Sequence, residues 1–134
     1  MLIWGVSKLD LLQVMKALAD ETRMRILYLL THGDLCVCEL ELILDINQSN
    51  ASRHLNKLTN AKILDYYKVG KYVYYKINEK AIKQYPFLSE IINNYSDEME
   101  LFKEDSERLK KYKDAGLNCD SFKDGNLILK DIIK

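Results

Sequence analysis

The chain has 134 residues, enough for one domain with a buried core, and its 20 basic residues balance 20 acidic ones. An apolar content of 48% with 30% charged residues excludes a disordered chain, and the apolar runs are too short to span a membrane. Residues 1–5 lack the basic start and long apolar centre of a signal peptide, so we expect a cytoplasmic protein without a membrane partner.

Three amphipathic helices are predicted in the first third of the chain. Apolar residues recur at helical spacing over 7–19, and a second apolar face follows over 21–32. Asp20 is placed to cap the second helix, and Gly33 is a stop signal after it. A third, short helix is predicted over 36–44.

A fourth helix is predicted after a turn at 45–48, with Ser49 as its expected N-cap. Its apolar side chains share one face, and the polar ones lie opposite: Asn50, Arg53, Asn56 and Lys57. Two helices joined by a tight turn, the second polar at its start, are typical of a helix-turn-helix whose second helix enters the major groove of DNA.

Positive charge is concentrated immediately after the start of this fourth helix. Residues 53–83 contain eight basic and two acidic side chains, whereas 34–52 contain four acidic side chains and no basic one. Attraction of phosphate depends on local fields, so a net charge of zero does not exclude DNA binding. An ordinary solvated face is the alternative, but the basic block coincides with the predicted DNA-binding elements.

A β-hairpin is predicted next. The runs 63–68 and 72–77 are rich in tyrosine and β-branched residues and are joined through Gly70. The alternating tyrosines favour cross-strand pairing, and Lys68 and Lys71 would lie near the DNA backbone. The predicted fold is therefore mainly α with a small β-hairpin, a winged helix-turn-helix.

A long C-terminal dimerisation helix is predicted after Pro86, which fits the first position of a helix. Residues at steps of four and three form one stripe: Leu88, Ile92, Tyr95, Met99, Phe102, Ser106 and Leu109. The alternative is that this stripe packs on the first helix of its own chain. The two interpretations are compatible if Leu12 and Met15 of the first helix also join the dimer interface. A two-fold dimer would place two recognition helices about one DNA turn apart. Residues 1–113 would then form the DNA-binding and dimerisation domain, with 114–134 a tail of unpredicted role.

Cys36 and Cys38 lie one residue apart at the start of the predicted third helix. Three cysteines do not make a disulfide framework, and a close pair in a reducing compartment indicates ligand or redox chemistry. The alternative is that the cysteines are small buried hydrophobic residues, which is the favoured interpretation for the isolated Cys119. A helix start would also lower the pKa of these thiols and favour the thiolate that metals need.

A switching mechanism follows from this spacing. Residues two apart are separated by about 200° around a regular helix, so both sulfurs can bind one ion only if the first turn deforms. Because that helix is the first half of the predicted helix-turn-helix, the deformation would displace Ser49, Ser52 and Arg53 from the groove.

These residues resemble the ArsR/SmtB family of metal-responsive bacterial repressors, of the arsenic-sensing type, over about 9–82. Four segments carry the resemblance: Ala17 to Leu27, Leu35-Cys36-Val37-Cys38-Glu39-Leu40, Gln48 to Leu55, and Tyr74 to Ile77. It implies a homodimer that binds a palindromic double-stranded DNA operator and releases it when a metal or metalloid binds. The family's DNA contacts would fall on Gln48, Ser49, Ser52 and Arg53, with His54, Asn56 and Lys57 as further candidates.

The inducing ion is expected from ligand chemistry. Thiolates favour arsenite, antimonite, cadmium and lead, whereas the family's zinc or nickel site needs histidines on the last helix, and none follows His54. Arsenic-sensing members carry a third cysteine where this chain has Glu41, and cadmium and lead sensors add cysteines before the pair. We therefore expect arsenite or antimonite at Cys36 and Cys38, with Cys119 a candidate third ligand, and cadmium or lead as alternatives.

Three rival functions stay open at this point. The two thiols could respond to oxidants or persulfides by forming a cross-link, the pair could belong to a thiol oxidoreductase, or the winged helix could bind only proteins. An oxidoreductase is disfavoured because the cysteines are one residue apart and no strand-helix-strand context surrounds them. We also find no carboxylate pair, nucleophile triad or glycine-rich phosphate loop, so we expect neither an enzyme nor an organic cofactor.

Overall fold

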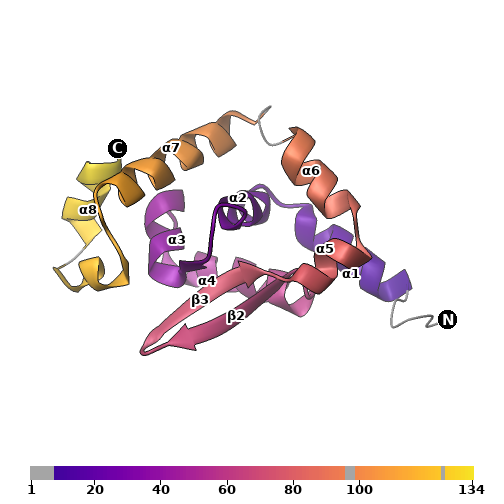
Figure 1. Cartoon of the computed structure of the whole chain (residues 1–134). Helices are drawn as coiled ribbons and strands as arrows, with labels where there is room; N and C mark the ends of the chain where they lie inside the picture. Colours follow the sequence, from indigo (N-terminus) through magenta and orange to yellow (C-terminus); the bar gives the residue numbers. More distant parts are fainter. Residues whose placement is uncertain (1–7, 96–98, 125) are drawn as a thin grey trace.

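A computed structural model describes residues 8–95, 99–124 and 126–134, which form a helical fold with one small sheet (Figure 1). The helices are α1 (Lys8–Leu18), α2 (Glu21–Leu30), α3 (Val37–Leu44), α4 (Gln48–Asn60), α5 (Glu79–Gln84), α6 (Phe87–Tyr95), α7 (Glu100–Asp114), the 3-10 helix η2 (Cys119–Asp124) and α8 (Asn126–Ile133). The strands are β1 (Leu35–Cys36), β2 (Leu64–Val69) and β3 (Tyr72–Ile77). The predicted fold class, mainly α with a small hairpin, is confirmed.

The helix-turn-helix is formed by α3 and α4, supported by α2. Its apolar side chains meet in one core that excludes water almost completely: Ile26, Leu29, Leu40, Ile43, Leu55 and Leu58. The turn between α3 and α4 begins at Asp45, whose backbone is left-handed with φ of 53°. This core fixes α4 against α3 and leaves the opposite face of α4 exposed.

Two helix starts were predicted from capping residues, and one prediction was wrong. The Asp20 carboxylate accepts a hydrogen bond of 3.1 Å from the Arg23 amide and caps α2 as expected. Helix α4, however, is capped by Asn47, whose side chain accepts from the Asn50 amide at 2.8 Å. Asn47 has the extended backbone that an N-cap needs, so the helix begins two residues earlier and Ser49 lies within its first turn.

The sheet is antiparallel with the order β1-β3-β2. Tyr66 pairs with Tyr75 and Tyr67 with Tyr74, which confirms the predicted cross-strand tyrosine pairs. Strand β1 was not predicted, because two residues are too few to produce an alternating pattern. It brings Cys36 opposite Tyr74, so the cysteine segment is joined directly to the wing.

The prediction of one long C-terminal helix was wrong. Helix α6 ends at Tyr95, and Met99, with an extended backbone, precedes the start of α7 at Glu100. Figure 1 shows α7 lying across α2 and reaching α3 and α8. The predicted stripe is thereby divided between two helices that pack on their own chain, and Leu88, Ile92 and Phe102 are buried there.

A buried ion pair holds α7 on the helix-turn-helix. The Asp105 carboxylate is fully buried and accepts two hydrogen bonds of 2.8 Å from the Arg25 guanidinium on α2. Arg108 pairs with the same carboxylate, and its Nε donates to the Ile43 carbonyl of α3 at 2.7 Å. The position of α7 therefore depends on this buried ion pair as well as on its apolar side chains.

The tail after α7 is also folded onto the domain. Helix α8 packs on α7 and α3, and η2 contacts α3. Leu129 and Ile133 are buried there. In the part of the chain that the structure describes, we find no helix with the length and apolar character that crossing a bilayer requires.

Candidate DNA-binding surface and thiol site

Helix α4 presents a polar face to solvent. The predicted DNA-contacting residues that are exposed on it are Gln48, Ser49, Ser52, Arg53, Asn56 and Lys57. The only ionisable groups among them are Arg53 and Lys57, so the face has positive charge and no negative charge. A helix face of this kind can contact base edges and phosphates together.

His54 does not lie on that face, so its assignment as a DNA contact is corrected. Its side chain is 5% exposed, and its ring nitrogens lie 3.2 Å from Arg23 Nη1 and 3.3 Å from Arg53 Nη2. Burial lowers the pKa of His54, as do the charges of Arg53 and Arg23, although Asp20 opposes them. Arg23 also donates to the Ala17 carbonyl at 2.6 Å, so His54 belongs to the contact that joins α4 to α1 and α2.

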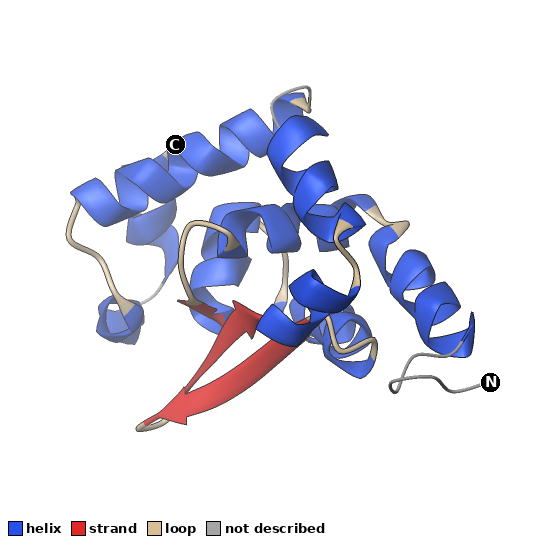
Figure 2. Cartoon of the chain, turned by 45° about the vertical axis from the view of Figure 1, so that its right-hand side comes forward, coloured by secondary structure: helices blue, strands red, loops and turns tan. Residues whose placement is uncertain are grey.

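The wing carries further positive charge. Figure 2 shows the β2–β3 hairpin projecting beyond the helices, and both Lys68 and Lys71 near its tip are exposed. Gly70 at the tip has a φ of +61°, a conformation that favours glycine in a tight hairpin turn. The Tyr67 hydroxyl donates to Asp34 at 2.7 Å, which ties strand β2 of the wing to the residue before β1.

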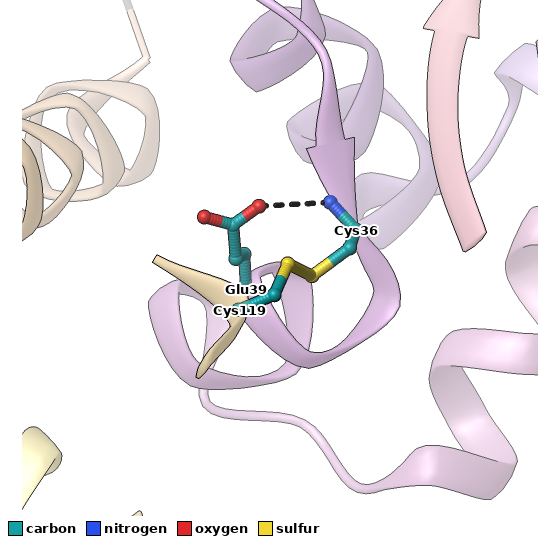
Figure 3. Close-up of side chains that lie close together, drawn as sticks. All are labelled: Cys36, Glu39 and Cys119. Atoms are coloured by element: carbon teal, nitrogen blue, oxygen red, sulfur yellow. Dashed lines mark hydrogen bonds between the residues drawn. A yellow bond between two sulfur atoms is a disulfide. The ribbon is translucent and has the colours of Figure 1, made fainter. Parts of the chain in front are cut away.

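The thiol site unites two segments that are distant in the sequence. Cys36 and Cys119 form a disulfide that joins the start of α3 to η2 (Figure 3). The two sulfurs and a carboxylate oxygen of Glu39 all lie within 4.8 Å of one another. All three side chains are at least 93% buried, since their exposed fractions are 2%, 3% and 7%. The candidate third ligand at position 119 therefore lies beside Cys36.

Cys38 is not a member of this group. Cys36 has an extended backbone and ends β1, whereas Cys38 lies in the first turn of α3 and keeps a half-buried free thiol. Burial raises the pKa of Cys38, and the charges of Glu41 and Glu39 raise it further. The expectation of a lowered thiol pKa at this helix start was wrong for Cys38, because burial and the neighbouring carboxylates outweigh the lowering by a backbone hydrogen bond.

Glu39 is a member of this cluster that the sequence analysis did not name as a site residue. Its Oε1 accepts from the Cys36 amide at 2.9 Å, and its Oε2 accepts from the Tyr112 hydroxyl of α7 at 2.6 Å. Burial and the adjacent Glu39 carboxylate raise the pKa of Tyr112 well above its usual range. A glutamate three residues after an N-cap is a capping-box signal that could have indicated the first contact, whereas the contact with α7 has no local signal.

The tail also touches the wing at this point. The Tyr74 hydroxyl lies 3.2 Å from Cys119 Sγ, and the Tyr72 hydroxyl donates to Asp120 at 2.8 Å. Both tyrosines belong to β3. The thiol site therefore contacts α3, the wing and the tail at once, so a change at the sulfurs can reach both candidate DNA-binding elements.

Comparison with known proteins identifies the family. Residues 20–66 match the family described as bacterial regulatory protein, arsR family. The cadmium resistance transcriptional regulatory protein CadC of Listeria innocua is 39% identical over 85 residues, which cover 63% of this chain and 69% of that protein. The chain belongs to the ArsR family. The matched segment contains Cys36, Cys38 and Glu39 and ends before Cys119.

Other relatives of this ArsR-family protein are regulators of two kinds of resistance. A cadmium resistance regulatory protein CadC homolog of Staphylococcus aureus is 43% identical over 79 residues, 58% of this chain and 65% of that protein. The arsenical resistance operon repressor of Bacillus subtilis is 38% identical over 71 residues, 52% of this chain and 68% of that protein. The matches thus span about two thirds of these relatives. The ArsR-family chain is a transcriptional regulator and not an enzyme.

Solved structures agree with the winged helix-turn-helix. Reduced HlyU from Vibrio cholerae matches with a TM-score of 0.58 and 28% identity, covering 65% of this chain and 90% of that one. A second HlyU structure from the same species matches with a TM-score of 0.59 and 27% identity, covering 67% and 98%. The shared architecture covers about two thirds of this ArsR-family regulator.

Proposed function

We propose that this regulator is a homodimeric repressor that binds a double-stranded DNA operator and leaves it when a thiophilic ion binds the reduced Cys36 and Cys119 thiols. The candidate ions are arsenite, antimonite, cadmium and lead, consistent with relatives that regulate arsenical and cadmium resistance. The observation that carries the proposal is the position of Cys36, which directly precedes α3 of the helix-turn-helix as its N-cap residue and faces Cys119 in a buried site.

The coupling between ion and operator follows from this position. An ion held between the sulfurs sets their separation, and Cys36 cannot move without shifting the start of α3 and its pairing with Tyr74 in the wing. A coupling free energy of about 1 to 3 kcal/mol would weaken operator binding by about 5-fold to 150-fold. In place of the Cys36–Cys38 pair predicted from sequence, the ion would bridge α3 and the tail.

The proposed operator contacts are of two kinds: contacts that read base edges and contacts that position the protein on the DNA backbone. Gln48, Ser49 and Ser52 lie at the exposed start of α4, where a recognition helix meets base edges. Arg53, Asn56 and Lys57 extend this face, and the wing lysines would contact the backbone.

The proposed dimer uses exposed apolar side chains. Leu12 and Met15 on α1, Tyr95 at the end of α6 and Met99 directly before α7 expose about half of their surface. Side chains of this size and exposure are ordinary singly but are typical of an interface when gathered. The other three residues predicted for the interface are buried in their own chain, so they would support this surface from beneath.

The proposal is tested by fluorescence anisotropy with DNA from the promoter upstream of the protein's own coding sequence. The reduced protein is titrated with arsenite, antimonite, cadmium and lead in turn. Cys36→Ser and Cys119→Ser should keep operator affinity and lose ion-induced release, whereas Cys38→Ser is the matched control that should still respond. Normal release from Cys36→Ser or Cys119→Ser would exclude this site as the sensor.

The disulfide itself supports a second candidate function. Two thiols that form a disulfide lose two electrons and two protons to an oxidant such as a peroxide, and the cross-link would hold α3 and η2 together. An oxidant-responsive repressor would change operator affinity between its reduced and oxidised forms in a metal-free buffer. Equal operator affinities of the reduced and oxidised forms would exclude the oxidant as the signal and leave the thiophilic ion.

A further inference from the structure

We propose that Glu39 is an oxygen ligand which, with Cys36 and Cys119 of the same protomer, completes a two-sulfur, one-oxygen site selective for divalent cations such as cadmium. This inference rests on the proposed function, because it concerns the same site. It narrows the candidate inducers to divalent cations. Arsenite and antimonite would then bind this site more weakly than cadmium does.

The geometry brings the three donors together without a partner subunit. The donor atoms lie within 4.8 Å of one another and come from the β1–α3 junction, the first turn of α3 and the start of η2 (Figure 3). Their burial excludes the bulk water that would otherwise compete for a bound cation. Thiolate sulfur and carboxylate oxygen are both established donors for divalent ions of intermediate softness.

Charge balance favours a divalent cation at this site. Two thiolates and one carboxylate form a buried cluster of negative charge, which is costly unless a cation compensates it. Arsenite binds two thiols by condensation, forming two arsenic–sulfur bonds and releasing two waters, and the product carries no charge. It therefore offers the Glu39 carboxylate no compensation, whereas a divalent cation does.

The hydrogen bonds of Glu39 fit a ligand role. Its Oε1 accepts from the Cys36 amide and its Oε2 from the Tyr112 hydroxyl, which together fix the orientation of the carboxylate. Each carboxylate oxygen has a second lone pair, so a cation can bind without breaking either contact. Groups that orient a ligand in this way commonly change metal affinity by about 10-fold to 100-fold when they are removed.

The site binds a cation only in its reduced form. A phosphine reductant supplies two electrons to the Cys36–Cys119 disulfide, and two protons complete the thiols. Binding then forms two cadmium–sulfur bonds and one cadmium–oxygen bond and releases the two thiol protons.

The test compares Glu39→Gln with Glu41→Gln in the full chain, reduced and titrated with cadmium against a chromophoric chelator. Glutamine keeps an oxygen acceptor for the Cys36 amide but removes the carboxylate charge. We expect Glu39→Gln to weaken cadmium binding by about 10-fold or more and to leave arsenite binding unchanged. Glu41→Gln, the same change on the same helix outside the cluster, should bind both ions as the wild type does. Unchanged cadmium affinity in Glu39→Gln would overturn the inference.

A measurement on the unmodified chain guards against misfolding of the variant. Cadmium-edge X-ray absorption of the loaded wild type should show two sulfur neighbours with oxygen completing the sphere. Three or more sulfurs, with Cys38 as a ligand, would overturn the inference. If Glu39-dependent cadmium binding occurs but operator affinity does not change, the proposed function fails and the ligand assignment stands.

Discussion

The segment from α2 to the wing and the segment from α7 to α8 share one apolar core but differ in the specific contacts that position them. The first folds around apolar side chains at regular spacing, such as Leu55 and Leu58, and contains the part that matches the ArsR family. The second also packs apolar side chains, such as Leu109 and Leu129, into this core, and it is linked to the first by specific buried contacts at Asp105, Tyr112 and Cys119. Short-range patterns can thus encode a helix-turn-helix, whereas the position of the segment after it also depends on a few specific long-range contacts.

Breaking the Arg25–Asp105 pair is expected to have the largest effect, because Asp105→Ala leaves a buried guanidinium without its carboxylate. We expect a loss of about 3 to 5 kcal/mol in the free energy of unfolding, measured by urea denaturation. Asp114→Ala, on the same helix but in an exposed pair with Lys110, should change it by less than about 0.5 kcal/mol. Equal losses in the two variants would show that α7 is not anchored by this pair.

Removing the hydroxyl that links α7 to Glu39 should have an intermediate effect. Tyr112→Phe keeps the buried ring but leaves a carboxylate oxygen of Glu39 without its donor. We expect a loss of about 1 to 3 kcal/mol in unfolding free energy. The matched variant Tyr66→Phe, at an exposed position on the wing and outside the proposed dimer interface, should be neutral in the same assay. A neutral Tyr112→Phe would mean that this contact does not hold the two segments together.

The DNA-binding segment can be tested without disturbing the docked one. Lys71→Ala at the wing tip should weaken binding to all DNA sequences similarly and reduce the slope of log affinity against log salt by about 1. Fluorescence anisotropy over a range of salt concentrations measures the slope. Lys110→Ala on α7 removes another exposed positive charge, far from the wing in the sequence, and should leave the slope unchanged. A wild-type slope in Lys71→Ala would remove the wing tip from the interface.

The smallest expected effect is the pH dependence conferred by His54. Because its pKa in the folded state lies below the unfolded value of about 6.5, the unfolded chain binds the proton more readily. Its contribution to stability is complete above that unfolded value and is lost as pH falls through the lowered pKa. When the pH is lowered from 7.5 to a mildly acidic value, the unfolding free energy of His54→Gln should therefore fall by less than that of the wild type. Urea denaturation at each pH measures this difference. Parallel pH profiles would contradict this assignment.

Local signals predicted the DNA-binding segment well. The cap at Asp20, the paired tyrosines of the wing and the helix-turn-helix were found from spacing, because each depends on neighbours a few residues away. The family resemblance, by contrast, suggested His54 as a DNA contact, although the helix turns it toward Arg23 and Asp20. Periodicity also extended one helix through Met99, where the backbone is extended.

The sequence by itself determined the family, the winged helix-turn-helix and the importance of Cys36, because these depend on short-range patterns. Only the tertiary structure decided which group Cys36 meets. Cys119 lies 83 residues away, and Tyr112 reaches Glu39 across 73 residues. No periodic pattern connects such positions, since the packing of α7 on α2 and α3 brings them together. The composition of the thiol site is therefore a property of the folded chain, whereas the DNA-binding motif is already present in its segments.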